Sequence, residues 1–537
     1  MNILHKIYIQ ILNRLLAIAI YKGDLMSYDI IITSDRTMIS NHHSNEFLGF
    51  LTTSPSMGLP EPIWMWLAAP KVKVDKIGRP IQAPYGLRKI EAALQNAGFK
   101  AAIIDPDHIY KHLDKAKIVM IGHHDYFALG PPSCEWMMIT GREPVNARSF
   151  RRFMERFTQA ARNKDIKIVV GGPAAWQWLY MPKLIEKYRI STIIDGEADK
   201  IITYIAQKIL RGDSLPKYIQ VSLNDTPRLD EIPLIKYPSV NGFIEVMRGC
   251  PRKCRFCSVT LRPLRIYTFN MIERELKVNS LAGIRKGILH AEDLLLYGSD
   301  GVKPKPEPLI KLHELVKKYY MNIAWSHVSL STVKYGQENF KLISKLTEII
   351  YGSGQSWIGV EVGVETGSVR LARRIMPMKA LPYPPETWPE VVEDAFMIMH
   401  EHRIIPAATI IIGLPDETED DVLETIELMD KLKKYRSLIV PMFFVPMGTL
   451  KDKNWFKILN IREAHEELLV KCFRHSIYWA EDILSKFYLR EPHQAPLNIL
   501  LKTVINYFKI KTRSFLKYYE NRSLTTKLKI CCTARVQ

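Results

Sequence analysis

The 537-residue chain has few cysteines and no long hydrophobic run. Its 7 cysteines are too few and too unevenly spaced for a disulfide framework, which indicates a reducing compartment. No stretch reaches the roughly 18 to 20 consecutive apolar residues of a membrane-spanning helix, and we find no secretory signal with a cleavage site. These absences argue against a disulfide-stapled secreted module and an integral membrane protein. We therefore expect a cytoplasmic protein.

A hydrophobic content of 47% and a charged content of 24% are ordinary for a globular protein, and the length predicts two or three domains. The net charge of +19 is spread along the chain. Basic proteins often meet nucleic acid, anionic lipid or phosphorylated substrates, but no nucleic-acid module is recognisable and we do not expect a nucleic-acid partner. Residues 1–25 read either as a basic amphipathic extension or as sequence before a true start at Met26. The tail Lys502–Arg535, rich in basic and aromatic residues, fits peripheral contact with a membrane surface and equally fits packed helices.

Three cysteines in one short loop are the most informative feature. Cys250, Cys254 and Cys257 have the spacing C-x3-C-x2-C. Three thiolates can hold three irons of a four-iron cubane, whereas a complete set takes four cysteines, so one iron would stay open to a ligand that is not protein. The alternative, a zinc knuckle, needs four ligands, commonly in two pairs, and no second pair lies nearby.

This loop, with its flanking Arg-Gly-Cys-Pro and with Phe256 before the last cysteine, resembles the signature of the radical SAM superfamily. The resemblance implies one [4Fe-4S] cluster whose open iron binds S-adenosylmethionine (SAM). Reductive cleavage of SAM would give a 5′-deoxyadenosyl radical that removes hydrogen from an unactivated carbon. It also implies a small-molecule or lipid substrate and an electron donor such as ferredoxin or flavodoxin.

Strand–helix units after the loop carry further elements of the resemblance, in the order that the superfamily shows. They predict a partial (β/α) barrel over residues 241–448, with its chemistry at the carboxyl ends of the strands, followed by a helical region over residues 449–537. By resemblance, the residues that border the cofactor, beside Phe256, are Glu292 and Asp293, Ser326, Glu365 in Gly-x-Glu-x-Gly, and Gly413 and Pro415 in Gly-Leu-Pro-x-Glu-Thr.

Residues 26–213 alternate apolar strands and amphipathic helices, which predicts a doubly wound parallel sheet that binds ligands at the carboxyl ends of its strands. The fold class is therefore α/β, with this sheet in front of the barrel. Residues 214–240 are polar and interrupted by prolines, and we expect an interdomain linker there.

About residues 60–210 resemble the B12-binding domain of many radical SAM enzymes, through pieces that include Gly171-Gly172 and Gly196. The resemblance implies cobalamin. No Asp in the chain has His two positions later, so the D-x-H-x-x-G motif is missing and cobalamin would lack a lower His ligand. The glycines either allow close approach of a large flat ligand or form plain tight turns. We expect His123-His124-Asp125 to be structural and not a metal site.

Together these features predict a radical SAM enzyme that functionalises a carbon by C-methylation or by C–C bond or ring formation, with a membrane lipid as one candidate substrate. We expect a single cluster, because only Cys134 precedes the loop and the three later cysteines are too few and badly spaced for another. Two alternatives stay open: a SAM- or cobalamin-binding sensor with a structural cluster, and a nucleic-acid-modifying radical SAM enzyme.

Overall fold

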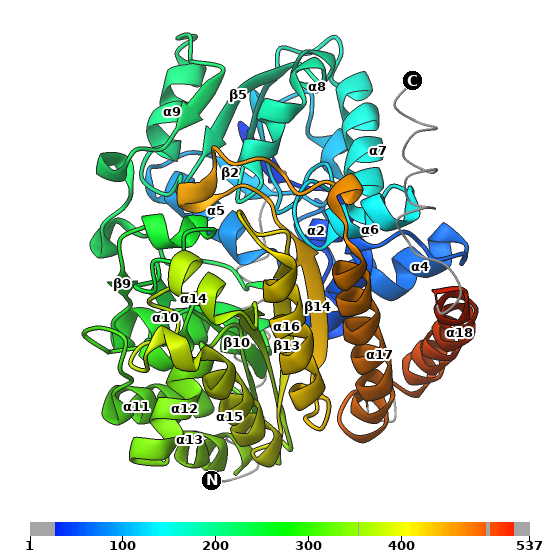
Figure 1. Ribbon diagram of the computed structural model, residues 1–537. Helices are drawn as coiled ribbons and strands as arrows, with labels where there is room; N and C mark the ends of the chain where they lie inside the picture. Colours follow the sequence, from blue (N-terminus) through cyan, green and yellow to red (C-terminus); the bar gives the residue numbers. More distant parts are fainter. Residues whose placement is uncertain (1–26, 353, 490–493, 520–537) are drawn as a thin grey trace. The chain divides into compact units, whose positions relative to one another are not determined.

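The computed structural model describes residues 27–352, 354–489 and 494–519 (Figure 1). Two compact units divide the chain. Among the described residues, the N-terminal unit comprises residues 27–133, 142–244 and 267–287, and the C-terminal unit comprises residues 134–141, 245–266 and those from 288 to 519. The predicted extension, residues 1–25, lies outside the described residues, as does part of the basic tail.

The N-terminal unit is built on a six-stranded parallel sheet in the order β2-β1-β3-β4-β5-β6. Its strands are β1 (Ile30–Thr33), β2 (Ala101–Ile103), β3 (Ile118–Gly122), β4 (Lys167–Gly171), β5 (Ile190–Asp195) and β6 (Tyr218–Gln220). The central strands are nearly continuous runs of Ile and Val, as expected where helices cover both faces of a parallel sheet. The predicted doubly wound parallel sheet is confirmed.

Two hydrophobic clusters, one on each face of this sheet, hold its helices. On one face, Phe150 and Phe157 of α7 pack with Trp178. On the other, Leu94 of α5 packs with Ile205 of α9. The helices of this unit are α2 (Arg36–Ile39), α3 (Glu46–Gly49), α4 (Glu61–Ala68), α5 (Tyr85–Asn96), α7 (Val145–Ala160), α8 (Pro182–Lys187), α9 (Ile202–Leu210) and α10 (Phe269–Leu281).

The segment expected as a linker, residues 214–240, instead contributes strand β6, in which Tyr218 pairs with Ile193. Helix α10, expected in the barrel, also belongs to the N-terminal unit. The almost inaccessible ammonium of Lys89 lies 2.6 Å from a carboxylate oxygen of Glu275 on α10, and this carboxylate also accepts the backbone N–H of Ile235 at 3.0 Å. A three-residue edge strand among prolines leaves little sequence pattern, so β6 is not apparent from the sequence alone.

The C-terminal unit contains the parallel strands of a partial barrel in two sheets of three, β11-β10-β7 and β12-β13-β14. An isolated parallel bridge between His327 and Glu361 connects β11 to β12. The strands are β7 (Ile244–Glu245), β10 (Lys286–His290), β11 (Asn322–Trp325), β12 (Ile358–Glu365), β13 (Ile404–Ile412) and β14 (Leu438–Phe443). The predicted α/β class with a partial barrel is confirmed.

Helices alternate with these strands and continue beyond them (Figure 1). They are α6 (Ser133–Thr140), α11 (Pro306–Lys317), α12 (Leu330–Phe340), α13 (Leu342–Tyr351), α14 (Val369–Ile375), α15 (Trp388–Glu401), α16 (Glu419–Leu432), α17 (Glu463–Lys486) and α18 (Ala495–Tyr519). Helix α6 joins the barrel unit through Glu135, which accepts the backbone N–H of Phe443 at 2.5 Å. The predicted C-terminal helical region is present. None of the described helices is both long and apolar enough to cross a bilayer.

Candidate functional site

The three cysteines lie on a closed loop. Strand β8 (Met247–Arg248) pairs antiparallel with β9 (Arg265–Ile266). Residues 249–264 therefore form a loop whose two ends lie side by side. Gly249, with φ +87°, makes this closure feasible, because a Cβ there would lie 2.5 Å from the carbonyl oxygen of Pro263. The chain therefore displays Cys250, Cys254 and Cys257 together at the end of a strand.

All three side chains are free thiols, with Cys254 buried and the other two partly exposed. Burial raises the pKa of Cys250 to about 12 and that of Cys254 to about 11. Iron needs thiolates, so loading would release protons. In the described part of the chain, no three His, Cys, Asp or Glu side chains gather closely enough for a single metal ion. Three thiols on one loop match the number that a four-iron cluster with one open iron needs, whereas a structural zinc site takes four ligands.

Arg252, inside the cysteine loop, anchors it to the barrel. This buried guanidinium lies 3.1 Å from a carboxylate oxygen of Asp293, just after β10. It also donates to three backbone carbonyls in the segment after α14, those of Met378, Lys379 and Leu381. The backbone N–H of Arg255 donates to Ile375 at 3.0 Å. The loop is thus fixed by one ion pair and by several hydrogen bonds to backbone carbonyls between Ile375 and Leu381.

Of the two acidic residues after β10, Asp293 is fully engaged. Besides Arg252, it accepts the backbone N–H of Ser329 at 3.1 Å and the hydroxyl of Thr332 at 3.0 Å. Glu292 is partly exposed, and its charge acts on both Cys257 and His327. The structure therefore gives these neighbours different roles, with Asp293 holding the loop and Glu292 facing outward.

A second buried ion pair, between Lys379 and Glu365 at the end of β12, lies beside the loop. Burial favours the neutral amine, yet Glu365 outweighs it and raises the pKa of Lys379 above its ordinary value. The ammonium lies 5.7 Å from the ring centre of Phe256, and Thr409 donates to Glu365 at 3.0 Å. Gly363 provides the room, since a Cβ there would lie 2.0 Å from the Glu365 carboxylate. The sequence indicated Phe256 and Glu365 but gave no sign of Lys379 or Arg252.

At β11 and β12 lies a set of polar side chains that is only partly buried. His327 follows β11, and its Nε2 lies 2.8 Å from a carboxylate oxygen of Glu361 on β12, the two side chains being 37% and 40% exposed. Burial lowers the pKa of His327, but Glu361 raises it further, to about 9. Ser326 is turned the other way: its hydroxyl lies 3.0 Å from Nδ1 of His290 and donates to the carbonyl of Ala291.

The Gly-Leu-Pro turn after β13 is held by the start of α17. Gly413 has φ +81°, and a Cβ there would lie 2.0 Å from the ring of Phe456. Its N–H donates to Glu417 at 2.9 Å, and Glu417 lies 2.8 Å from Nε2 of His465. Pro415 is partly exposed beside it. The shape of this turn is therefore fixed by the chain itself.

Two of the three predicted glycines of the N-terminal sheet are explained by close approaches within their own unit. Gly172 has φ +92°, and a Cβ there would lie 2.8 Å from the carbonyl oxygen of His123, while one on Gly196, with φ +128°, would lie 2.6 Å from Val221. A Cβ on Gly171 would touch the carbonyl of Ile194 at 3.4 Å. The contacts at Gly172 and Gly196 account for glycine without a bound ligand, whereas the contact at Gly171 is an ordinary van der Waals distance and does not.

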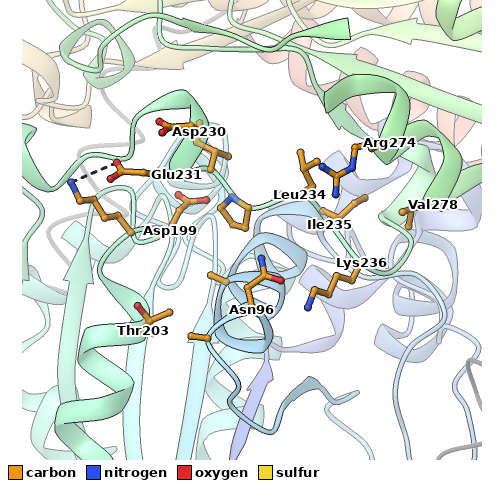
Figure 2. Close-up of a pocket in the computed structure, with 15 residues that line it drawn as sticks. Asn96, Asp199, Thr203, Asp230, Glu231, Leu234, Ile235, Lys236, Arg274 and Val278 are labelled. Atoms are coloured by element: carbon orange, nitrogen blue, oxygen red, sulfur yellow. Dashed lines mark ion pairs between the residues drawn. The ribbon is translucent and has the colours of Figure 1, made fainter. Parts of the chain in front are cut away.

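Figure 2 shows a cavity of about 640 Å³ in the N-terminal unit. Asn96 and Thr203 line it together with the segment 230–236 and Arg274 of α10. The ion pair between Lys200 and Glu231 lies in its wall at 3.6 Å. None of the predicted site residues lines it.

The Radical SAM superfamily matches residues 244–429. Curated relatives include an uncharacterized methyltransferase of Pyrococcus horikoshii, 23% identical over 50% of this chain and 59% of its own length. An uncharacterized protein of Methanocaldococcus jannaschii is 25% identical over 54% of this chain and 65% of its own length. A tRNA-2-methylthio-N(6)-dimethylallyladenosine synthase of Clostridium tetani is 24% identical over 54% of this chain and 60% of its own length. The chain thus spans less than two thirds of the length of each.

Two solved structures of the radical SAM methyltransferase TsrM from Kitasatospora setae also resemble the chain. One, described with tryptophan substrate and a SAM analog bound, has a TM-score of 0.49 at 14% identity and covers 77% of this chain and 73% of its own. The other, described with cobalamin and a [4Fe-4S] cluster bound, has a TM-score of 0.48 at 15% identity and covers 78% and 75%. Its sequence match and its three-cysteine loop show that the chain carries a radical SAM domain at residues 244–429.

Proposed function

We propose that this chain is a radical SAM enzyme that functionalises an unactivated carbon, by methylation or by C–C bond or ring formation. The observation that carries the proposal is the closed loop with three thiols, fixed to the barrel by the pair Arg252–Asp293. When bound, a [4Fe-4S] cluster supplies the electron that cleaves SAM into methionine and a 5′-deoxyadenosyl radical, which removes hydrogen from the substrate.

The chain's own residues would position these groups. Cys250, Cys254 and Cys257 would hold the cluster. Burial raises the pKa of Cys254 and Cys257, and the charge of Lys379 counteracts this rise, which favours the thiolates that iron requires. Phe256, in the same loop, has its ring centre 5.7 Å from the Lys379 ammonium. Arg252, by fixing the loop, keeps the thiols in one arrangement before the cluster is bound.

For SAM, we assign Glu292 to the ammonium group, since its carboxylate is partly exposed beside the loop and Asp293 is already engaged. Glu365, Ser326, Gly413 and Pro415 would line the rest of the cofactor site from the ends of β11, β12 and β13. The partly exposed pair His327–Glu361 lies on the same strands, and we assign it to the orientation of the substrate.

Methyl transfer is the outcome that the relatives favour, because those named by activity are methyltransferases or methylthiotransferases. Cobalamin is the methyl carrier proposed for the N-terminal unit, whose parallel sheet is of the type that binds ligands at its strand ends. A membrane lipid is a further candidate substrate. It is supported by the apolar residues exposed on α18, among them Ile499 and Ile510, near Lys502 and Lys509.

The test is anaerobic reconstitution with iron, sulfide and hydroxocobalamin, followed by reduction with dithionite in the presence of SAM and assay of 5′-deoxyadenosine. We expect deoxyadenosine from the wild type and none from Cys254→Ala. Cys472→Ala is the matched control, because Cys472 is a buried thiol on α17 outside the loop. About four irons per chain would agree with one cluster, and about eight would contradict it.

The same sample, after desalting, shows whether corrinoid is retained. Retained cobalamin favours methyl transfer, and its loss favours hydrogen abstraction that ends in bond or ring formation. If a fully loaded and reducible cluster gives no deoxyadenosine with or without added lipid vesicles, the proposal fails and the sensor alternative gains.

A further inference from the structure

The cysteine loop carries an unbalanced positive charge. Between Cys250 and Ile266 the sequence has five basic residues and no acidic one. Arg252 is buried and paired, but Lys253 and Arg255 are exposed, and neither has a carboxylate partner in the described chain. Lys253 has φ +52°, a left-handed conformation between Cys250 and Cys254. Two cations therefore face outward from the segment that holds the thiols.

A second segment brings two more cations to this place. Gly448 begins η11 (Gly448–Leu450), and a Cβ on it would lie 2.6 Å from the carbonyl oxygen of Arg255. The N–H of Thr449 donates to the same carbonyl at 2.9 Å. Lys451 and Lys453 follow, one on each side of the exposed Asp452 in the sequence, and both are exposed and without a carboxylate partner among the residues the structure describes. We call Lys253, Arg255, Lys451 and Lys453 the cationic surface.

Exposed apolar side chains accompany these charges. Leu261 and Leu264, in the same loop, are 50% and 40% exposed. Leu261 ends η8 (Ser258–Leu261), which packs against η11. Cations around exposed leucines are typical of surfaces that meet another protein. Nucleic-acid strands are usually held by aromatic stacking as well as charge, and the aromatic residue of this loop, Phe256, is next to Lys379 and only partly exposed.

We propose that the cationic surface is the docking site of a small acidic electron-transfer protein. Cys250 and Cys257 are partly exposed in the same loop, so a donor bound here would approach the cluster closely. One electron would leave the reduced donor and enter the cluster, with no bond made or broken and no proton exchanged. Opposite charge speeds such encounters, which use small interfaces. This inference rests on the proposed function, because a donor is needed only where the cysteines hold a redox cluster.

The test uses the double variant Lys451→Glu/Lys453→Glu, since neither residue lies in the cysteine loop. The matched control is Lys318→Glu/Lys345→Glu, the same change of charge at exposed lysines at the end of α11 and on α13. Binding of an oxidised acidic flavodoxin is measured by calorimetry, and cluster reduction by the reduced flavodoxin is followed by stopped-flow absorbance. We expect affinity and second-order rate constant to fall at least roughly tenfold at low ionic strength in the double variant only. The difference should shrink as salt is added.

Dithionite separates this inference from the proposed function, because a small chemical reductant needs no docking surface. With dithionite, both double variants should form deoxyadenosine at the wild-type rate. If the wild type forms none, the proposed function fails, whereas flavodoxin binding still reports on the surface. The docking proposal is overturned if Lys451→Glu/Lys453→Glu binds and accepts electrons from flavodoxin like the wild type. It is also overturned if that variant loses affinity for a tRNA while its reduction by flavodoxin is unchanged.

Discussion

The two units differ in how far the polar side chains at the ends of their parallel strands are exposed. In the N-terminal sheet, Asp35 after β1 and His123 after β3 form a pair at 2.8 Å with no exposed surface on either side chain. In the barrel unit, His327 and Glu361 form a pair of the same length with more than a third of each side chain exposed. Polar residues at strand ends thus mark a sealed edge in one unit and an open edge in the other.

Asp35 shows how the sealed edge is kept. Burial alone would raise its pKa, but the hydrogen bond from His123 lowers it below the ordinary value. The backbone N–H and the hydroxyl of Thr37 also donate to it. Both carboxylate oxygens of Asp35 are engaged within the unit, so this pair contributes stability. The difference between the two edges is accessibility, not composition.

The largest effect should come from breaking the anchor of the cysteine loop. Arg252→Ala leaves Asp293 buried without its partner, and removing one member of a buried pair costs roughly 3–5 kcal/mol of unfolding free energy. We expect strongly reduced iron retention after desalting, measured by colorimetric iron assay, together with a lower urea midpoint. Arg374→Ala is the control, because Arg374 pairs with Asp416 at an exposed site and should cost less than about 1 kcal/mol. Full iron content in Arg252→Ala would show that the anchor is dispensable.

Breaking the sealed edge should destabilise a different part of the molecule. Asp35→Ala leaves His123 buried without its carboxylate, at a cost of about 3 kcal/mol, seen as earlier loss of structure in urea. Iron retention by the cysteine loop should stay at the wild-type level. Asp107→Ala, a partly exposed carboxylate paired with Lys71 and Arg36, should change stability much less. Loss of iron in Asp35→Ala would mean that the two edges are coupled.

A side chain added at Gly363 should destabilise the open edge, at a smaller cost in unfolding free energy than the two preceding changes. An added Cβ would lie 2.3 Å from Nζ of Lys379 as well as 2.0 Å from Glu365, and overpacking of this kind costs about 1–3 kcal/mol. Gly363→Ala should therefore lower the urea midpoint and reduce deoxyadenosine formation with dithionite. Gly301→Ala is the control, because nothing lies within 4 Å of a Cβ there. Equal behaviour of the two variants would show that the pair Lys379–Glu365 can shift freely.

The sequence predicted the features that follow from periodicity and spacing. Strands rich in Ile and Val, the three-cysteine loop and the turns at Gly363–Glu365 and Gly413–Pro415 all have patterns that short segments carry alone. Arg252 and Lys379 could not be found in this way. Their partners lie 41 and 14 positions away in the chain, and an isolated Arg or Lys looks the same whether it is buried or exposed. The same limit applies to Gly172, whose sequence fits a ligand contact and a plain tight turn alike, whereas the structure places the backbone of His123 beside it.

The smallest effect, and the finest test of the open edge, is the pH dependence of His327. Its pKa of about 9 in the folded protein exceeds the ordinary 6.5. The stability that its charge contributes is therefore fully present below pH 6.5 and is lost as the pH rises through about 9. Glu361 and Glu292 favour the charge, while Lys379 and burial oppose it. Because the pair is more than a third exposed, we expect only about 1 kcal/mol.

Urea unfolding of the wild type and of His327→Gln, measured between pH 6 and 9.5, isolates this contribution. The free energy of unfolding of the wild type should fall towards that of His327→Gln as the pH rises across that range. Glu361→Gln should remove the same pH dependence, since one interaction is lost in both variants. If the free energy of unfolding of His327→Gln depends on pH as that of the wild type does, the charged form of His327 is not stabilised by Glu361. The exposed pair then contributes no pH-dependent stability.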